Sequence, residues 1–270
     1  VRPVILRLNT EKLGDNSECN FENVTFEFAS DFTALDISKG KFNFIDCKFN
    51  NNSAEQQRPG AIYAHGESII KLIKCNFTGN TGDFHGGAIS VEIKSIELDE
   101  CSFIENKCNN QNPSSDANAR GGAIYFIAYS EFKLDYCTFE RNSAKSSGGA
   151  VHIEYHESSS KLLAFEKVFY VTNCTFADCE TKGEGGAITS GFIDKKGTKL
   201  DGDMEIENCK FINCRAENGG ALYFQDGTES GDEEKRIKNC LFVNCLSTHK
   251  DGEGFAIYAQ SFEFTMTFNN

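Results

Sequence analysis

The sequence is poor in proline and methionine, and it has no tryptophan and no long apolar run. Of its 270 residues, 3 are Pro, 2 are Met and none is Trp. No apolar run approaches the roughly 18–20 residues of a membrane-spanning helix, so we expect no membrane insertion within this chain. Lys and Arg number 27 against 40 Asp and Glu, a net charge of −13. This deficit of cations argues against nucleic acid as a partner, because phosphates are bound through a surplus of Lys and Arg.

Helix and hairpin patterns are also missing. No stretch carries an apolar period of 3.6 residues over the length of a helix. Two-residue Asn-Gly or Asp-Gly turns do not join the short apolar segments, so we expect no tight hairpins between them. The chain therefore contains short strands that must pair with something other than their sequence neighbours.

What the sequence does contain is a repeat. Gly-Gly-Ala, more or less intact, precedes an aliphatic residue at Ile62, Ile89, Ile124, Val151, Ile188, Leu222 and Ile257. A Cys-x-Phe motif starts at Cys19, Cys47, Cys75, Cys101, Cys137, Cys174, Cys209 and Cys240. Successive copies lie 28, 28, 26, 36, 37, 35 and 31 residues apart. Periods in this range are typical of repeat architectures, in which each repeat packs on the next.

Each repeat contains three segments in which apolar and other residues alternate. The segment after Gly-Gly places an aliphatic residue inward, as at Ile124, and a mixed set outward. The second reads apolar-x-apolar, as at Phe132 and Leu134, and Cys-x-Phe forms the third. Such segments can pair with their counterparts in the next repeat. We therefore predict an all-β fold, a single-stranded right-handed parallel β-helix of about eight coils with three short strands per coil.

Two features of the repeat suit the corners of such a coil. Gly-Gly permits a bend into the first strand, because a positive φ costs glycine little. Three residues after the Phe, four copies carry an Asn, and stacking would let each amide hydrogen-bond the next. We predict a structural ladder of Asn52, Asn80, Asn106 and Asn142.

The paired motifs, Gly-Gly-Ala-[Ile/Leu/Val] and Phe-x-x-Asn, resemble the repeat of the chlamydial polymorphic outer-membrane proteins. The first matches at 86–89, 121–124, 148–151, 185–188 and 219–222, and the second at 49–52, 77–80, 103–106 and 139–142. The resemblance extends from about residue 19 to residue 258. The departures are Phe32-Thr33 and Pro59 at the Gly-Gly site, Phe255 for its second Gly, and late Cys for Asn. The resemblance implies a surface-displayed β-helical protein that acts in adhesion.

The remaining cysteines follow the Cys-x-Phe motif at a near-constant distance. One interpretation is that disulfides close single turns, and the other is that buried thiols serve as small apolar residues. The candidate disulfide residues are Cys174, Cys179, Cys209, Cys214, Cys240, Cys245, Cys101 and Cys108. Zinc fits poorly, because no Cys-x-x-Cys pair is present.

Several surface features are candidates for recognition. Three insertions, at 155–166, 191–203 and 225–236, follow the first strand of successive repeats and should project side by side, and a fourth lies at 107–120. The last of the three is acidic, which makes Ca²⁺ a candidate cofactor, although its carboxylates follow no ligand-spacing template. We expect no other cofactor. Outward tyrosines at Tyr63, Tyr125, Tyr223 and Tyr258 form a candidate binding surface. Glycosylation sequons start at Asn23, Asn51, Asn76 and Asn173.

These features favour a non-catalytic, adhesin-like protein at the cell surface or outside the cell. Its partners would be a protein or glycan on a host or neighbouring cell. The alternatives are a pectin-lyase-like carbohydrate-active enzyme, which needs flanking carboxylates or Ca²⁺ with a base, and a filament that self-associates end to end. We expect residues 1–270 to form one β-helix domain, a fragment of a longer repeat protein, because the sequence is strand-like at both ends.

Overall fold

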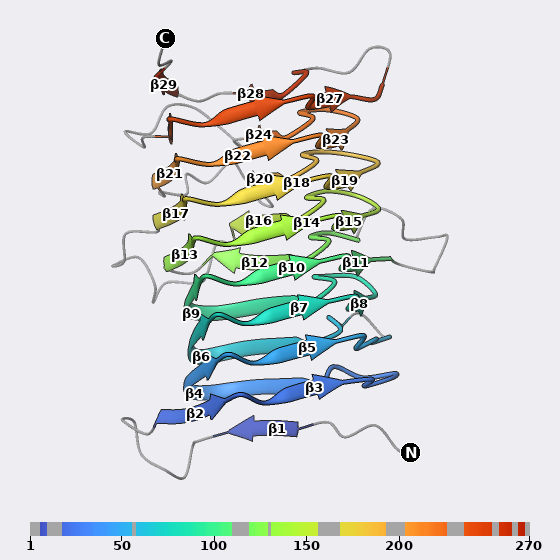
Figure 1. Cartoon of the computed structure of the whole chain (residues 1–270), viewed down its shortest axis with the longest axis vertical. Coiled ribbons are helices and arrows are strands. Elements are labelled where there is room, and N and C mark those ends of the chain that lie inside the picture. The colour runs from blue at the N-terminus through green and yellow to red at the C-terminus, as the bar shows by residue number, and fades with distance from the viewer. Residues whose placement is uncertain are drawn as a thin grey trace.

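The chain folds as a parallel β-helix, and the fold class predicted from the repeat is confirmed (Figure 1). The computed structural model describes residues 6–9, 18–55, 58–109, 119–128, 131–155, 168–192, 203–225, 235–249, 254–260 and 264–267. Every strand pair in these ranges is parallel. Strands of one kind lie one above another along the long axis, with β1 and β29 at opposite ends of the view.

Three sheets run along the β-helix, which we call sheets A, B and C. Sheet A contains β1 (Leu6–Asn9), β2 (Glu18–Glu22), β4 (Leu35–Ile45), β6 (Ile62–Ile73), β9 (Ile89–Asp99), β12 (Ile124–Ala128), β13 (Glu131–Asp135), β16 (Val151–Tyr155), β17 (Val168–Thr172), β20 (Ile188–Phe192), β21 (Asp203–Glu207), β24 (Leu222–Gln225), β25 (Lys235–Lys238), β28 (Ile257–Gln260) and β29 (Phe264–Thr267). Sheet B contains β3 (Thr25–Glu27), β5 (Lys48–Asn50), β7 (Asn76–Thr78), β10 (Ser102–Ile104), β14 (Thr138–Glu140), β18 (Thr175–Ala177), β22 (Lys210–Ile212) and β26 (Leu241–Val243). Sheet C contains β8 (Thr81–Gly82), β11 (Lys107–Cys108), β15 (Ser143–Ala144), β19 (Glu180–Thr181), β23 (Arg215–Ala216) and β27 (Leu246–Ser247).

The strands differ in detail from the three predicted segments. The first and second segments both belong to sheet A, and they join into single strands of 11 or 12 residues in β4, β6 and β9. From β12 onward they are separate strands of that same sheet. From β8 onward the third sheet is instead sheet C, whose two-residue strands were too short to show an alternating pattern.

Most coils turn three corners in the left-handed backbone region, although the coil with Pro59 at its third corner has only two. In one coil the corners are at Tyr136 (φ 49°), Arg141 (φ 52°) and Gly148 (φ 63°), and equivalent residues repeat along the chain. The glycine after the third corner has no room for a side chain, since a Cβ on Gly122 would lie 1.9 Å from the carbonyl oxygen of Gly149. The first glycine of the pair thus allows a corner at positive φ, and the second allows two coils to approach closely.

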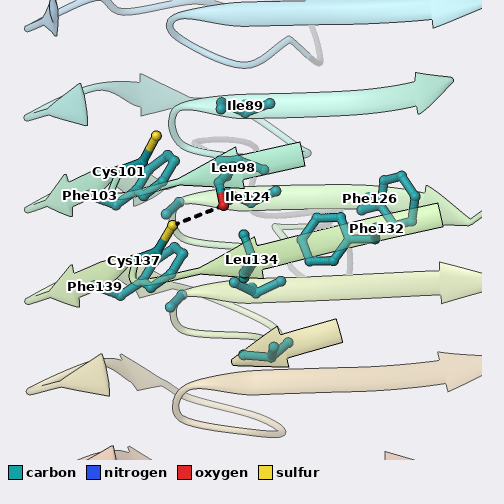
Figure 2. Close-up of a cluster of buried hydrophobic side chains, with 14 of the residues drawn as sticks. Ile89, Leu98, Cys101, Phe103, Ile124, Phe126, Phe132, Leu134, Cys137 and Phe139 are labelled. Atoms are coloured by element: carbon teal, nitrogen blue, oxygen red, sulfur yellow. Dashed lines mark hydrogen bonds between the residues drawn. The ribbon is translucent and has the colours of Figure 1, made fainter. Parts of the chain in front are cut away.

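Identical side chains stack along the core. The Phe side chains of sheet B form an unbroken column from Phe26 to Phe242, with ring centroids 4.6–5.1 Å apart. Figure 2 shows this stacking in two successive coils, with Cys101 above Cys137 and Phe103 above Phe139. The thiol of Cys137 donates to the carbonyl oxygen of Leu98. Stacked ring pairs stabilise the core by more than the burial of their apolar surface alone.

The four asparagines lie in one buried column. Each side-chain amide from Asn52 to Asn106 donates to the next asparagine's Oδ1 at 2.9–3.0 Å. Each amide nitrogen also donates to a Phe carbonyl oxygen in the preceding coil, as Asn142 does to Phe103 at 2.9 Å. From Cys179 onward cysteine takes over this position, and its thiol donates to the equivalent carbonyl oxygen of Phe139 at 3.7 Å.

The first copy of the Cys-x-Phe repeat was misplaced. Cys19 pairs in register with Phe42, and Phe21 pairs with Phe44, so this segment belongs to sheet A. The equivalents of Cys47 and Phe49 are Val24 and Phe26. The prediction failed because Cys19-x-Phe21 and Val24-x-Phe26 both read as apolar-x-apolar, and only the first contains cysteine.

Candidate functional site

The outer face of sheet A carries a group of ionisable side chains that contact one another across neighbouring coils. The first residue after each inward aliphatic points outward there, and these positions include the four predicted tyrosines. The structure differs from the expected exposed strip. Tyr125 and Tyr223 are only 3% and 6% exposed, whereas Tyr63 and Tyr258 are partly exposed. The tyrosines are therefore not one continuous binding surface.

Tyr125 is buried because two histidine rings cover it. The ring of His85 lies 4.1 Å from the Tyr125 ring at an interplanar angle of 11°, and His152 lies 5.6 Å away on the next coil. His85 comes from the ladder of residues that precedes each Gly-Gly pair, which pairs His85 with Arg120 and Arg120 with Ser147. That ladder runs beside the outward row, so its side chains can close over the sheet.

Arg120, Tyr125 and Glu154 form the centre of this group. The guanidinium Nη1 of Arg120 donates to Oε2 of Glu154 at 2.9 Å, and the Tyr125 hydroxyl donates to the same oxygen. The Glu154 side chain is only 6% exposed. A buried carboxylate is tolerated when a cation and hydrogen bonds compensate its charge, which is the arrangement here. Burial, followed by the charge of Glu154, raises the pKa of Tyr125.

His85 and His152 are neutral at pH 7. Burial, helped by the nearby Arg120 charge, lowers the pKa of His85 to about 4. The same causes, with His85 as a further neighbour, lower the pKa of His152 well below its ordinary value. Nδ1 of His152 lies 2.9 Å from the Ser147 hydroxyl, which holds the ring in place. We call His85, Arg120, Tyr125, Ser147, His152 and Glu154 the outer polar cluster.

A second and more open group lies three coils earlier on this face. Asp36 contacts Arg58 at 3.5 Å and Nε2 of His65 at 3.2 Å. The Arg58 guanidinium lies 4.8 Å above the Tyr63 ring, a cation–π contact. This second group contains the same residue types as the outer polar cluster, namely an arginine, a tyrosine, a histidine and an acid.

The two groups were missed because their contacts join different coils. Arg120 and Glu154 are 34 residues apart, and Asp36 and His65 are 29 apart. Reading along one strand cannot connect such residues. Comparing the positions just before Gly-Gly with those two and four residues after the alanine would have brought them together.

Asp36 and Glu154, the acids of these two groups, are poorly placed to act as a pair in glycoside hydrolysis. Asp36 and Glu154 are four strand steps apart in sheet A, roughly 19 Å at the usual strand spacing. Hydrolases place their two carboxyl groups about 5–9.5 Å apart. Each of these acids is also engaged by an arginine. Among the described residues, no group of three His, Cys, Asp or Glu side chains could hold a metal ion.

The structure places the cysteines in separate columns. All twelve are free thiols in it, including the eight candidates for disulfides. Cys174 and Cys179 stand at successive corners, and each thiol is engaged with a different column. Cys174 lies between Cys137 and Cys209, whereas Cys179 donates to a carbonyl oxygen of the preceding coil. Cys108 sits apart from Cys101, in a small cluster with Ala119 and Ala144.

The sequons lie at or beside corners of the coil. Asn23, Asn51 and Asn76 are exposed, and Asn23 and Asn51 adopt positive φ. Asn173 is partly buried and its Nδ2 donates to Oδ1 of Asp135 at 2.8 Å. Glycosylation at these sites stays a prediction, and Asn173 is the least accessible of the four.

Only the stems of the predicted insertions fall within the described residues. Strands β16 and β20 pair in register and precede the first two insertions, and β24 follows in the same row. Residues 156–167, 193–202 and 226–234 lie outside the described ranges, as does 110–118 of the fourth insertion. The acidic segment considered for Ca²⁺ lies there too. No helix in the described residues is long and apolar enough to cross a bilayer.

Comparison with known proteins identifies the fold family. A family model described as the right-handed β-helix region matches residues 9–164, more than half of the chain. The chain belongs to the right-handed β-helix family. The match does not confirm the narrower resemblance to polymorphic outer-membrane proteins. No curated protein and no solved structure matches this β-helix.

Proposed function

We propose that this β-helix is a non-catalytic, adhesin-like protein, displayed on a cell surface or secreted, that binds a glycan through its lateral surface. The observation that carries the proposal is the closed pairing of the outer polar cluster. Its one carboxylate is held by Arg120 and Tyr125, and the cluster is largely shielded from solvent. A polysaccharide enzyme needs such groups open to its substrate.

The regularity of the coils supports the same proposal. Sheet register continues from β12 through β16, β20 and β24 to β28 without a shift. A rod with this register holds the insertions after β16, β20 and β24 in one row, as a surface that presents loops requires. The resemblance to polymorphic outer-membrane proteins points the same way, and exposed sequon asparagines fit a secreted or surface chain.

A second candidate function, elimination on a uronate polysaccharide, is favoured by one observation. Arg120 could neutralise a substrate carboxylate, and His85 is neutral at pH 7 and so able to accept a proton. Against it, the raised pKa of Tyr125 keeps its hydroxyl protonated at neutral pH, so no phenolate is present to act as the base, and the cluster is already paired.

The experiment is a combined screen for binding and cleavage on one panel of polysaccharides, including pectin, xylan, mannan and chitin fragments. The proposal expects saturable binding and no new reducing ends or unsaturated products. Turnover that survives purification and is lost in Arg120→Ala would establish the lyase instead. Arg141→Ala is the matched control, because Arg141 pairs with Glu105 on an exposed corner. Failure to bind any glycan would contradict the proposal.

A further inference from the structure

Tyr136 is an unusual residue for its position. It occupies the corner before Cys137 at φ 49°, and its ring is 60% exposed. Bulky side chains are rare in this backbone region, whereas Asn and Asp are enriched there. The equivalent corner holds small or flexible polar residues in the other coils, namely Asp46, Lys74, Glu100, Asn173, Asn208 and Asn239. The exposed Tyr136 ring adds little to the core, so packing does not account for it.

A surface groove lies beside this ring. It is a shallow, open depression of about 440 Å³, lined by Glu100 and Cys101 of one coil and by Tyr136 and Thr138 of the next. Cys101 is buried and closes the base, while the Glu100 and Thr138 side chains are exposed. The groove therefore has one aromatic wall, a carboxylate and a hydroxyl. An apolar surface with a few convergent polar groups is the usual composition of a small-ligand site.

The charge around the groove selects among ligands. Among the described residues, the ion pair of Glu100 is a long one, 3.9 Å, with the exposed Lys74. Asp135 precedes Tyr136, and its Oδ1 accepts hydrogen bonds from Thr172 and Asn173. These carboxylates, in a chain of net charge −13, disfavour uronates and sulfated sugars. A neutral ligand with many hydroxyl donors fits better, because ionised carboxylates accept the stronger hydrogen bonds.

A sugar ring meets these requirements better than a protein does. One face of a pyranose is apolar enough to lie on an aromatic ring, and its hydroxyls can donate to a carboxylate. A stable protein interface buries about 800 Å² on each partner. The neighbouring outward residues, such as Lys48, Asn76 and Ser102, are polar and offer no apolar area of that kind.

We propose that the Tyr136 groove binds a neutral pyranose unit, with the Tyr136 ring against the sugar face and Glu100 accepting hydrogen bonds from its hydroxyls. The inference rests on the proposed glycan-binding function and specifies the site and sugar class. Thr138, which lines the same wall, supplies a further hydroxyl.

The experiment measures binding of neutral cello-, manno- and chito-oligosaccharides, and of oligouronates for comparison, by calorimetry and by saturation-transfer NMR on the full chain. Tyr136→Asn should weaken binding by about tenfold or more, whereas Tyr136→Phe should stay within about threefold. Glu100→Gln should weaken it by a few fold. Tyr170→Ala, at a partly exposed tyrosine in the middle of β17, is the matched control and should bind like the unaltered protein. Tyr136→Asn suits the left-handed corner, so misfolding would not explain a loss.

The outcomes separate this inference from the function on which it rests. If neutral sugars bind and Tyr136→Asn binds equally well, the groove is wrong and glycan binding stands. If oligouronates bind and neutral sugars do not, the sugar class is wrong. If none of the saccharides binds, both proposals fail. If the sugars are cleaved, the non-catalytic function fails, and an unchanged KM in Tyr136→Asn would overturn the groove as well.

Discussion

The Asn106 side-chain oxygen accepts two hydrogen bonds from Asn80, one from its backbone N–H at 3.0 Å and one from its side-chain amide at 2.9 Å. Asn106 itself donates through Nδ2 to the carbonyl oxygen of Phe77 at 2.9 Å. One buried side chain thus satisfies main-chain groups of two other residues. The column holds successive coils in register at a corner where the sheets themselves are interrupted.

Replacing Asn106 by alanine should therefore destabilise the β-helix strongly. The change leaves a buried carbonyl oxygen and buried N–H groups without partners, and each unsatisfied group costs about 1–3 kcal/mol. We expect a loss of about 3 kcal/mol in the free energy of unfolding, measured by urea denaturation.

Asn106→Cys provides the informative comparison. Cys179, Cys214 and Cys245 occupy this same position in later coils, and their thiols donate to Phe carbonyl oxygens. Cysteine should recover the donor to Phe77 but provide only a weak acceptor for Asn80. Its loss should lie between zero and that of alanine. Equal losses for both variants would show that the Phe carbonyl bond contributes nothing measurable.

Tyr136→Asn should raise the free energy of unfolding. Asparagine tolerates the left-handed corner better than tyrosine, and equivalent corners already hold Asn173, Asn208 and Asn239. We expect a gain of about 0.5–1 kcal/mol. Asn208→Tyr is the reciprocal variant and should lose a similar amount. A destabilised Tyr136→Asn protein would mean that the ring makes a packing contribution not expected from its exposure.

The sequence predicted the coil because the repeat marks the inward positions of sheets A and B. Equivalents of Gly121-Gly122 and Cys137 recur in most coils and the Asn142 position is Asn in four of them, because positive φ, small volume and amide pairing restrict what can stand there. Sheet C escaped prediction because two residues cannot show a period. The shifted first coil shows the same limit, since Val24 fills the core position as well as cysteine does.

The outward surface was much harder to predict. Inward residues repeat because the core is the same in every coil, but outward residues differ from coil to coil. Whether Tyr125 is exposed depends on His85, which reaches it from the preceding coil. Similarly, the contact between Glu154 and Arg120 depends on the register between their coils. Tyr136 was not predicted as a site residue because one aromatic in a polar row carries no periodic signal.

The stability of the β-helix should fall as pH drops from about 6.5 to 4. His85 has a folded pKa of about 4 against an ordinary value of 6.5, because burial and Arg120 disfavour its charged form. Within this window the unfolded chain binds a proton that the folded chain does not, so lower pH favours unfolding. The loss from His85 alone should reach roughly 3 kcal/mol across the window, and His152 should add to it.

Urea titrations at pH 7 and pH 5 test this dependence. His85→Phe keeps a ring over Tyr125 but cannot titrate, so it should show a shallower slope than the unaltered protein. Every other charged group of the outer polar cluster, Arg120 and Glu154, remains in that variant. His249→Gln is the control, because the His249 side chain is exposed and far along the chain. An identical slope in His85→Phe would contradict a neutral buried His85.

The cysteine columns should make most thiols unreactive in the folded protein. Ten of the twelve are buried, and Cys19 and Cys240 are only partly so. Burial also raises the pKa of the Cys179 thiol to about 12, which leaves almost no thiolate at neutral pH. We therefore expect a thiol reagent at pH 8 to modify no more than about two cysteines quickly, Cys19 and Cys240, and all twelve after unfolding in urea. Mass mapping without reduction would identify them, and a Cys174–Cys179 or Cys209–Cys214 disulfide in that map would contradict the separate columns, because those residues would have to leave different corners of the coil to meet.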